Sequence, residues 1–216
     1  MSAARPLLLF PCNGNAVEAL DCLDESWDCL GFVDDTPEKQ GGTVGGVTVH
    51  DRGAFDRWPD ARVLAVPGGP ESFPKRRAVI EGLSISEERY ARVVHPGATV
   101  SPNVGVGHNT LIMAGVVLTS NAVLGNHCCV LPNSVVHHDS RIGDWTLIGA
   151  SVIIAGGVTI GCNCYIASGS GIMHGLAVGD GALVGFGANV IRNVAAGARV
   201  VGNPARELPD TGAHIT

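Results

Sequence analysis

Apolar residues recur at every sixth position through the C-terminal half of the chain, without a break. These positions hold only Ile, Leu or Val: Val94, Val100, Val106, Ile112, Leu118, Leu124, Val130, Val136, Ile142, Ile148, Ile154, Ile160, Ile166, Ile172, Val178, Val184 and Val190. Faces recur every 3.6 residues in a helix and every 2 in a strand, so neither element alone produces this period. A six-residue period is typical of the hexapeptide β-helix. The pattern therefore predicts stacked triangular coils over residues 93–206, with residues 207–216 as a tail.

The repeat also predicts where a functional site can lie. No residue is inserted into the register between Val94 and Val190, so no loop protrudes from the coils. A prism without loops cannot enclose a ligand by itself. We therefore expect the site on the outer wall, in a groove between neighbouring subunits.

The N-terminal half has a different pattern, in which short apolar runs alternate with amphipathic stretches. The expected strands are Arg5–Pro11, Leu30–Val33, Val47–Val49 and Arg62–Val66, and the expected helices are Ala16–Leu23, Lys75–Leu83 and Ser86–Arg92. Strands that alternate with helices favour a small parallel α/β sheet. We therefore expect residues 1–92 to form a separate Rossmann-like α/β domain.

Polar and glycine residues follow the expected strands of this domain. In parallel sheets, ligands bind outside the carboxyl ends of the strands. Gly14 and Asn15 open a helix, which suits a phosphate, and Asp34 and Asp35 follow the second strand, which suits sugar hydroxyls. Gly14 lacks the flanking glycines of the dinucleotide-binding fingerprint, so ordinary turns of an α/β domain remain an alternative interpretation.

Candidate chemistry in the repeat centres on His138 and Asp139. Val136 is expected to point inward, which places His138 on the outer wall near a corner. A neutral imidazole is the usual general base, and an adjacent carboxylate fixes its tautomer. Gly156, one coil later, thins the wall there and could present a bare backbone N–H to an oxyanion. The alternative is that His138, like His174 two coils on, is a solvated surface residue.

Composition narrows the classes of partner. The net charge of -6 disfavours a nucleic-acid partner, because phosphate binding depends on excess Lys and Arg. No apolar run is long enough to span a membrane and no leader pattern is present, so we expect a cytoplasmic protein. The seven cysteines include no Cys-x-x-Cys pair, and His138 and His174 have no evident third ligand, so we expect no metal.

The chain resembles the bacterial hexapeptide-repeat sugar acetyltransferases, the group of the sialic-acid O-acetyltransferases and the bacillosamine and perosamine N-acetyltransferases. The residues that carry the resemblance are Gly31–Asp35, Val94–Ala98, Val136–Asp139, Ile142–Asp144, Gly185–Ala188 and Val201–Arg206. In this family a small Rossmann-like domain precedes a left-handed parallel β-helix, and the chain assembles as a homotrimer. The resemblance therefore implies transfer of an acetyl group from acetyl-CoA, usually to the amino group of a nucleotide-linked amino-deoxysugar.

The resemblance also implies roles for individual residues. His138 would be the general base, Asp139 its orienting carboxylate, and Gly156 the N–H donor to the acetyl carbonyl. Residues implied to contact acetyl-CoA are Gly156, Ser168, Phe186 and Pro204, and those implied to hold the nucleotide sugar are Gly14, Asn15, Asp34 and Asp35. No metal is needed for this reaction.

The chain departs from the family pattern at three places that concern the acceptor. The first loop, Cys12–Asn15, is shortened and lacks a histidine that the family places against the sugar. Leu131 and Leu147 stand where the family often has Asn and His. Two other functions therefore stay open, namely O-acetylation of a sugar hydroxyl and a non-catalytic β-helix protein.

Overall fold

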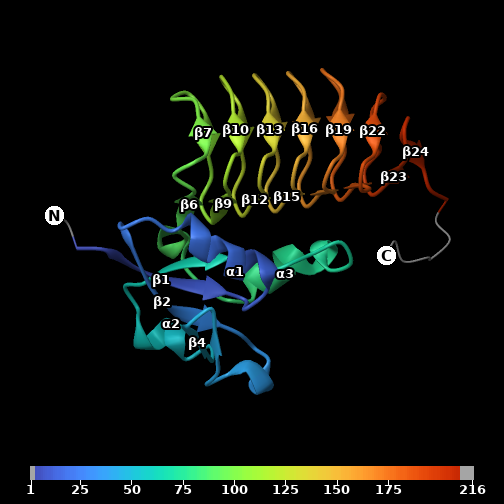
Figure 1. Cartoon of the computed structure of the whole chain (residues 1–216). Helices are drawn as coiled ribbons and strands as arrows, with labels where there is room; N and C mark the ends of the chain where they lie inside the picture. Colours follow the sequence, from blue (N-terminus) through green and yellow to red (C-terminus); the bar gives the residue numbers. More distant parts are fainter. Residues whose placement is uncertain (1–2, 210–216) are drawn as a thin grey trace.

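The computed structural model describes residues 3–209, which form an α/β unit and a parallel β-helix in contact with each other (Figure 1). The α/β unit holds one sheet of order β3-β4-β2-β1-β5, parallel except for the β3–β4 hairpin. Its strands and helices are β1 Arg5–Phe10, α1 Gly14–Ala19, β2 Trp27–Val33, β3 Thr43–Val44, β4 Val47–His50, α2 Ala54–Arg57, β5 Arg62–Ala65 and α3 Arg76–Glu81. Short 3₁₀ turns lie at Leu20–Cys22, Pro37–Lys39, Phe73–Lys75 and Glu87–Arg89.

The predicted strands of this unit are confirmed, and one predicted helix is wrong. Leu7, Leu8 and Leu9 of β1 are completely buried, as a central parallel strand requires. The predicted helix Ser86–Arg92 contains only the 3₁₀ turn Glu87–Arg89. The chain must become extended there, because Tyr90 pairs with Val63 beside β5 and β6 begins at Arg92.

The β-helix is a triangular prism whose three walls are parallel sheets of very short strands. The first wall contains β6 Arg92–Val94, β9 Thr110–Ile112, β12 Cys129–Val130, β15 Leu147–Ile148, β18 Tyr165–Ile166, β21 Leu183–Val184, β23 Arg199–Val201 and the antiparallel β24 Arg206–Glu207. The second wall contains β7 Thr99–Val100, β10 Val117–Leu118, β13 Val135–Val136, β16 Ile153–Ile154, β19 Gly171–Ile172 and β22 Asn189–Val190. The third wall contains β8 Gly105–Val106, β11 Val123–Leu124, β14 Arg141–Ile142, β17 Thr159–Ile160 and β20 Ala177–Val178.

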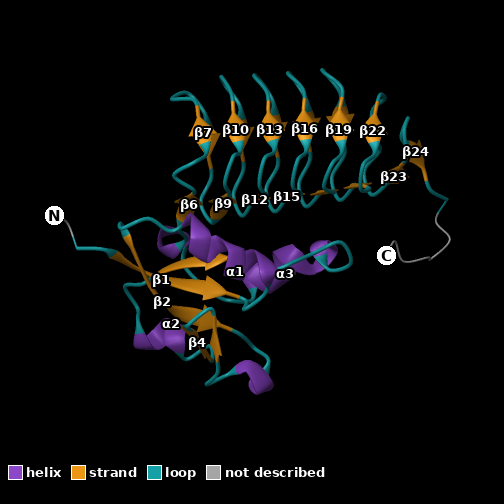
Figure 2. Cartoon of the chain, viewed as in Figure 1, coloured by secondary structure: helices purple, strands orange, loops and turns teal. Residues whose placement is uncertain are grey.

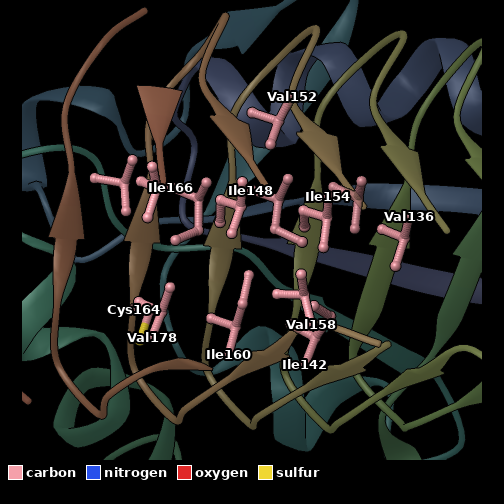
Figure 3. Packing of buried hydrophobic residues seen from close by; sticks show 14 of the residues in the cluster. Val136, Ile142, Ile148, Val152, Ile154, Val158, Ile160, Cys164, Ile166 and Val178 are labelled. Carbon is pink, nitrogen blue, oxygen red and sulfur yellow. The ribbon is translucent and has the colours of Figure 1, made fainter. Parts of the chain in front are cut away.

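The six-residue period produces the core of the prism. The repeat residues point inward and stack on their counterparts one coil away, as Val136 does on Ile154 (Figure 3). Val94 is an exception: it is 40% exposed, because no coil precedes it to cover its side chain. The eighteen-residue spacing ends after β22, since β21 pairs with β23 through Leu183 and Arg199.

The α/β unit is packed on the first wall of the prism. Leu111, Cys129 and Leu147 point outward from that wall into the same apolar cluster as Leu7 and Leu9. Figure 2 shows α1 between the sheet and the prism, with the β7-to-β22 wall on the far side. The corner between the second and third walls is therefore turned away from the chain's own α/β unit.

Buried polar side chains fix this junction. The Asn109 side chain accepts from the Ala65 N–H at 2.7 Å and donates to the Ala65 carbonyl at 2.9 Å, which ties the end of β5 to the prism. The fully buried Arg76 donates to the Pro67 and His127 carbonyls. Because these groups would be costly to leave unpaired, the two parts are held in one arrangement.

Candidate functional site

His138 lies at the corner between the second and third walls, here called the His138 corner. Val136 of β13 is completely buried, so the chain turns outward two residues later and exposes His138. Asp139 occupies the turn itself with a φ of +60°. Asp and Asn are among the few side chains that accept this left-handed conformation readily. The corner geometry thus places a carboxylate directly beside the histidine, as the sequence predicted.

The two side chains form a hydrogen-bonded pair. His138 Nδ1 lies 2.8 Å from Asp139 Oδ2, and both side chains are more than half exposed. The pKa of Asp139 is held below its usual value by the hydrogen bond from His138 and then by one from Asn121. An ionised carboxylate only accepts hydrogen bonds, so Nδ1 carries the proton. Nε2 is therefore left as a free proton acceptor on the outer wall.

Gly156 lies immediately beside that acceptor. A Cβ atom on this residue would stand 2.5 Å from His138 Nε2, so only glycine leaves room for the ring. The neighbouring Gly157 N–H donates to the His138 carbonyl at 2.9 Å. Among residues 3–209, no group accepts a hydrogen bond from the Gly156 N–H. The structure therefore brings together a basic nitrogen and an unused backbone donor, which is the pairing that acyl transfer requires.

A separate crevice lies where the α/β unit meets the first wall. Gly14 and Asn15 begin α1, and the Asn15 amide donates to the Gly68 carbonyl at 3.4 Å. A cavity of about 130 Å³ opens beside them. Its lining residues are Asn15, Gly68, Gly69, Pro70, Cys129, Leu131, Leu147, Ile148, Gly149 and Tyr165. Two positions at which the sequence departs from the family pattern, Leu131 and Leu147, thus form part of one apolar wall.

The two predicted carboxylates of the crevice already have protein partners. Asp34 is buried and accepts from the Cys12 N–H, the Thr36 N–H and Lys39 Nζ, each at 2.9 Å. Burial alone would raise the pKa of Asp34, but the hydrogen bonds from Thr36 and Lys39 outweigh it and lower the pKa. Asp34 is therefore placed to hold the loop together, and its contact with a ligand stays a prediction.

Asp35 is exposed and pairs with the Arg52 guanidinium through two hydrogen bonds of 2.6 and 2.7 Å. A ligand hydroxyl would have to share this carboxylate with Arg52. Sequence reasoning missed Lys39, whose half-exposed ammonium group lies at the same edge and donates to the Cys12 carbonyl at 2.8 Å. No motif surrounds this lysine, so the sequence contained no signal for it.

The residues predicted to contact acetyl-CoA are divided between two corners. Ser168 and Phe186 lie between the first and second walls, at the Phe186 corner, whereas Gly156 lies at the His138 corner. The Ser168 hydroxyl accepts from the Ala150 N–H at 3.0 Å, and the Phe186 side chain is 82% exposed. Pro204 is exposed between β23 and β24. In one chain the predicted residues therefore do not form a single continuous site.

Sequence reasoning also missed Asn121, which donates from Nδ2 to Asp139 Oδ1 at 3.0 Å. A signal was present: Asn103, Asn121 and Asp139 are spaced by eighteen residues, so one stacked corner carries all three. No cluster of three or more potential metal ligands occurs within residues 3–209. Over the same residues, no helix has the length and apolar character needed to cross a membrane.

Comparisons with known proteins agree with this architecture. The family "Bacterial transferase hexapeptide (six repeats)" matches residues 121–156, which include His138 and Gly156. No curated protein matches the chain. The acetyltransferase domain of PglB from Neisseria gonorrhoeae in complex with acetyl coenzyme A is 25% identical, with a TM-score of 0.84 over 95% of this chain and 100% of that one. WeeI from Acinetobacter baumannii is 26% identical, with a TM-score of 0.79 over the same shares.

A third structure shows the same fold. A variant of perosamine N-acetyltransferase from Caulobacter crescentus, in complex with CoA and GDP-perosamine, is 23% identical and has a TM-score of 0.85 over 97% of this chain and 99% of that one. The fold class predicted from the sequence, an α/β domain followed by a left-handed β-helix, is confirmed. The chain is thus an acyltransferase of the hexapeptide-repeat class. Its fold is similar to that of the bacterial sugar acetyltransferases that its sequence resembles.

Proposed function

We propose that the chain transfers an acetyl group from acetyl-CoA to the amino group of a nucleotide-linked amino-deoxysugar, with His138 as general base. The observation that carries the proposal is the His138–Asp139 pair with the bare Gly156 backbone beside Nε2. The similar structures support the choice of substrates, since PglB is bound to acetyl coenzyme A and perosamine N-acetyltransferase to CoA and GDP-perosamine.

The proposed reaction needs no covalent enzyme intermediate. The sugar amine attacks the thioester carbonyl carbon while His138 Nε2 accepts a proton from the amine. The Gly156 N–H stabilises the negative charge that develops on the carbonyl oxygen. When the carbon–sulfur bond breaks, an amide remains and the CoA sulfur leaves, receiving the proton that His138 holds. One base and one donor are sufficient because binding supplies the correct orientation.

The His138 corner and the crevice beside Asn15 lie apart in one chain, which supports an active site built by two subunits. The His138 corner lies between the second and third walls, whereas the chain's own crevice borders the first wall, which favours an acceptor and a base that come from different copies. The second wall connects the His138 and Phe186 corners and has no cover from the described residues. Ile153, Met173 and Ile191, on or next to its strands, are 55%, 44% and 42% exposed. Exposed apolar side chains grouped on one wall favour an interface.

A homotrimer with the second walls facing its axis is the arrangement that we propose. Around such a ring each subunit contacts one neighbour through its His138 corner and the other through its Phe186 corner. Ser168, Phe186 and Pro204 of one copy would then line the acetyl-CoA track that leads to Gly156 of the next. Gly14, Asn15, Asp34 and Asp35 would hold the nucleotide sugar in the adjoining crevice.

A screen for release of the CoA thiol tests the proposed function. The purified protein is incubated with acetyl-CoA and, separately, with nucleotide-linked amino sugars and their hydroxyl counterparts. Thiol release with an amino sugar, giving an alkali-stable amide, is the expected result. Release only with a hydroxyl sugar, giving an alkali-labile ester, would make the protein an O-acetyltransferase. Silence with every sugar would leave a β-helix protein without this activity.

A further inference from the structure

A ladder of hydrogen-bonded polar side chains runs along the His138 corner and ends at the His138–Asp139 pair. Asn103 Nδ2 donates to Asn121 Oδ1 at 2.5 Å, and Asn121 Nδ2 donates to Asp139 Oδ1 at 3.0 Å. Asp139 Oδ2 in turn lies 2.8 Å from His138 Nδ1. These asparagines and Asp139 are eighteen residues apart, so the stacking of coils brings them into line.

The direction of every hydrogen bond in the ladder follows from the carboxylate. Ionised Asp139 can only accept, so the Asn121 amide must turn its NH₂ group toward it. The Asn121 carbonyl oxygen then faces the preceding coil and requires a donor there, which Asn103 Nδ2 supplies. Asp139 thus has each oxygen engaged by a different partner, one by His138 and one by Asn121.

The ladder extends from the pair in one direction only. On the following coils, the position equivalent to Asp139 is glycine, at Gly157 and Gly175. Asn121, and Asn103 through it, therefore contact the His138–Asp139 pair only from the preceding coils. On the following coil, next to Gly156, no side chain of the ladder occupies the space that the reactants would need. Such support matters because the Asp139 side chain is 57% exposed, and an exposed carboxylate exchanges rotamers and partners with water.

We propose that Asn121 is a positioning residue that holds the Asp139 carboxylate in the rotamer that orients His138, with Asn103 holding Asn121. The inference rests on the proposed function for its catalytic meaning. Asn121 acts through Asp139 and touches neither reactant.

The charges around Asp139 agree with this role. His138 and Asn121 lower the pKa of Asp139 by hydrogen bonding, and the positive charge of Arg141 adds to the effect. Loss of the Asn121 amide should therefore raise the pKa of Asp139 toward its ordinary value. It should also free the carboxylate to leave Nδ1, so that His138 no longer keeps one tautomer.

The test uses Asn121→Gly in the full-length protein. Asn121 has a φ of +62°, which glycine adopts without strain, and Gly157 fills the same corner position two coils away. We expect kcat to fall about 3- to 10-fold, as for loss of one hydrogen bond, with KM unchanged for both substrates. Nitrogen-15 NMR should show His138 mostly as the Nδ1–H tautomer in the wild type and as a mixture of tautomers in the variant. Asn121→Asp, which opposes two carboxylates, should reduce kcat further.

Asn163→Gly is the matched control. Asn163 has a φ of +53° at the corner between the third and first walls, where its amide contacts Pro74. This variant should keep the wild-type kcat and the wild-type His138 spectrum. An Asn121→Gly protein with unchanged kcat and an unchanged tautomer would overturn the positioning role. A wild-type protein that transfers to no sugar would instead remove the proposed function, and the NMR comparison would still decide whether Asn121 orients His138.

Discussion

The imidazole of His138 lies directly against the backbone of Gly156, one coil further along the prism. A Cβ atom on Gly156 would come within 2.5 Å of Nε2 and 2.6 Å of Cε1. Any side chain at position 156 would therefore push the imidazole ring out of this position. The proposed base, His138, and the proposed oxyanion donor, the Gly156 N–H, are therefore in direct contact. A substitution at Gly156 also changes the position of His138.

Gly156→Ala should be folded but nearly inactive. The φ of Gly156 is not in the left-handed region, so alanine fits the backbone, but its methyl group would displace the imidazole by about 1 Å. A misplacement of that size can lower kcat by about 100-fold. Gly105→Ala is the control, since its Cβ would lie 3.7 Å from Val123, an ordinary contact. Steady-state kinetics with both variants would contradict this account if the Gly156→Ala protein kept its kcat.

Asp139→Asn should lower kcat by up to about 10⁴-fold, because an asparagine amide can donate to Nδ1 and so favours the tautomer that carries its proton on Nε2. Asparagine tolerates the φ of +60°, so the corner should be preserved. Hydrogen bonds from His138 and Asn121 hold the pKa of Asp139 below its usual value, so the carboxylate is ionised throughout the neutral range. Steady-state kinetics of the wild type and the variant at neutral pH measures this loss. An Asp139→Asn protein with the wild-type kcat would contradict the orienting role of the carboxylate.

Much of this architecture follows from the sequence because the hexapeptide register leaves few choices. Once Val136 is inside, His138 must be outside, and Asp139 must take the corner. Contacts between residues far apart in the sequence were harder to predict. The predicted helix Ser86–Arg92 was wrong because the strand pairing of Tyr90 with Val63 overrides local propensity.

The crevice was predictable only in part. Its position at the carboxyl ends of β1, β2 and β5 followed from the α/β pattern, and Asn15 does line a cavity there. That Asp34 would be buried and paired with Lys39 depends on the packed loop, which no motif describes. Asn121 was detectable from its eighteen-residue spacing to Asp139, but only a search for polar ladders along a corner would have found it.

The stability of the domain junction should decrease in mild acid because of His127. Burial, then the charges of His108 and Arg76, lower the pKa of His127 from 6.5 to about 4. The folded state thus binds a proton at His127 less readily than the unfolded state does. The contribution of the neutral His127 to stability is therefore complete above pH 6.5 and is lost as the pH falls toward 4. Between pH 7 and 5 the free energy of unfolding should drop by about 2 kcal/mol through this residue.

Urea unfolding of the wild type and of His127→Asn at both pH values measures this contribution. The variant is expected to be less stable at pH 7, since His127 stacks on Trp145 and accepts from Asn109, but to lose less stability on acidification. Equal losses in the two proteins would mean that His127 does not titrate in this way.

Ile153→Lys should disrupt the proposed trimer. Ile153 is 55% exposed on the second wall, where a lysine in a packed interface would bring an unpaired charge. Light scattering should show a lower molar mass, and transfer should be lost although the His138 corner is intact. Thr159→Lys changes the corresponding outward position of β17 on the third wall and should alter neither property. A monomeric but fully active Ile153→Lys protein would disprove a site shared between subunits.

The most direct test of the central claim compares wild type and His138→Asn in acetyl transfer to the nucleotide-linked amino sugar that the wild type uses best. Product is identified by mass spectrometry, while light scattering and CoA binding establish that the assembly and the cofactor site are intact. We predict an alkali-stable acetylated amine from the wild type. In the variant, kcat should fall about 10²- to 10⁴-fold with unchanged mass and CoA affinity, as for loss of a general base. An assembled His138→Asn protein with the wild-type kcat would contradict the account.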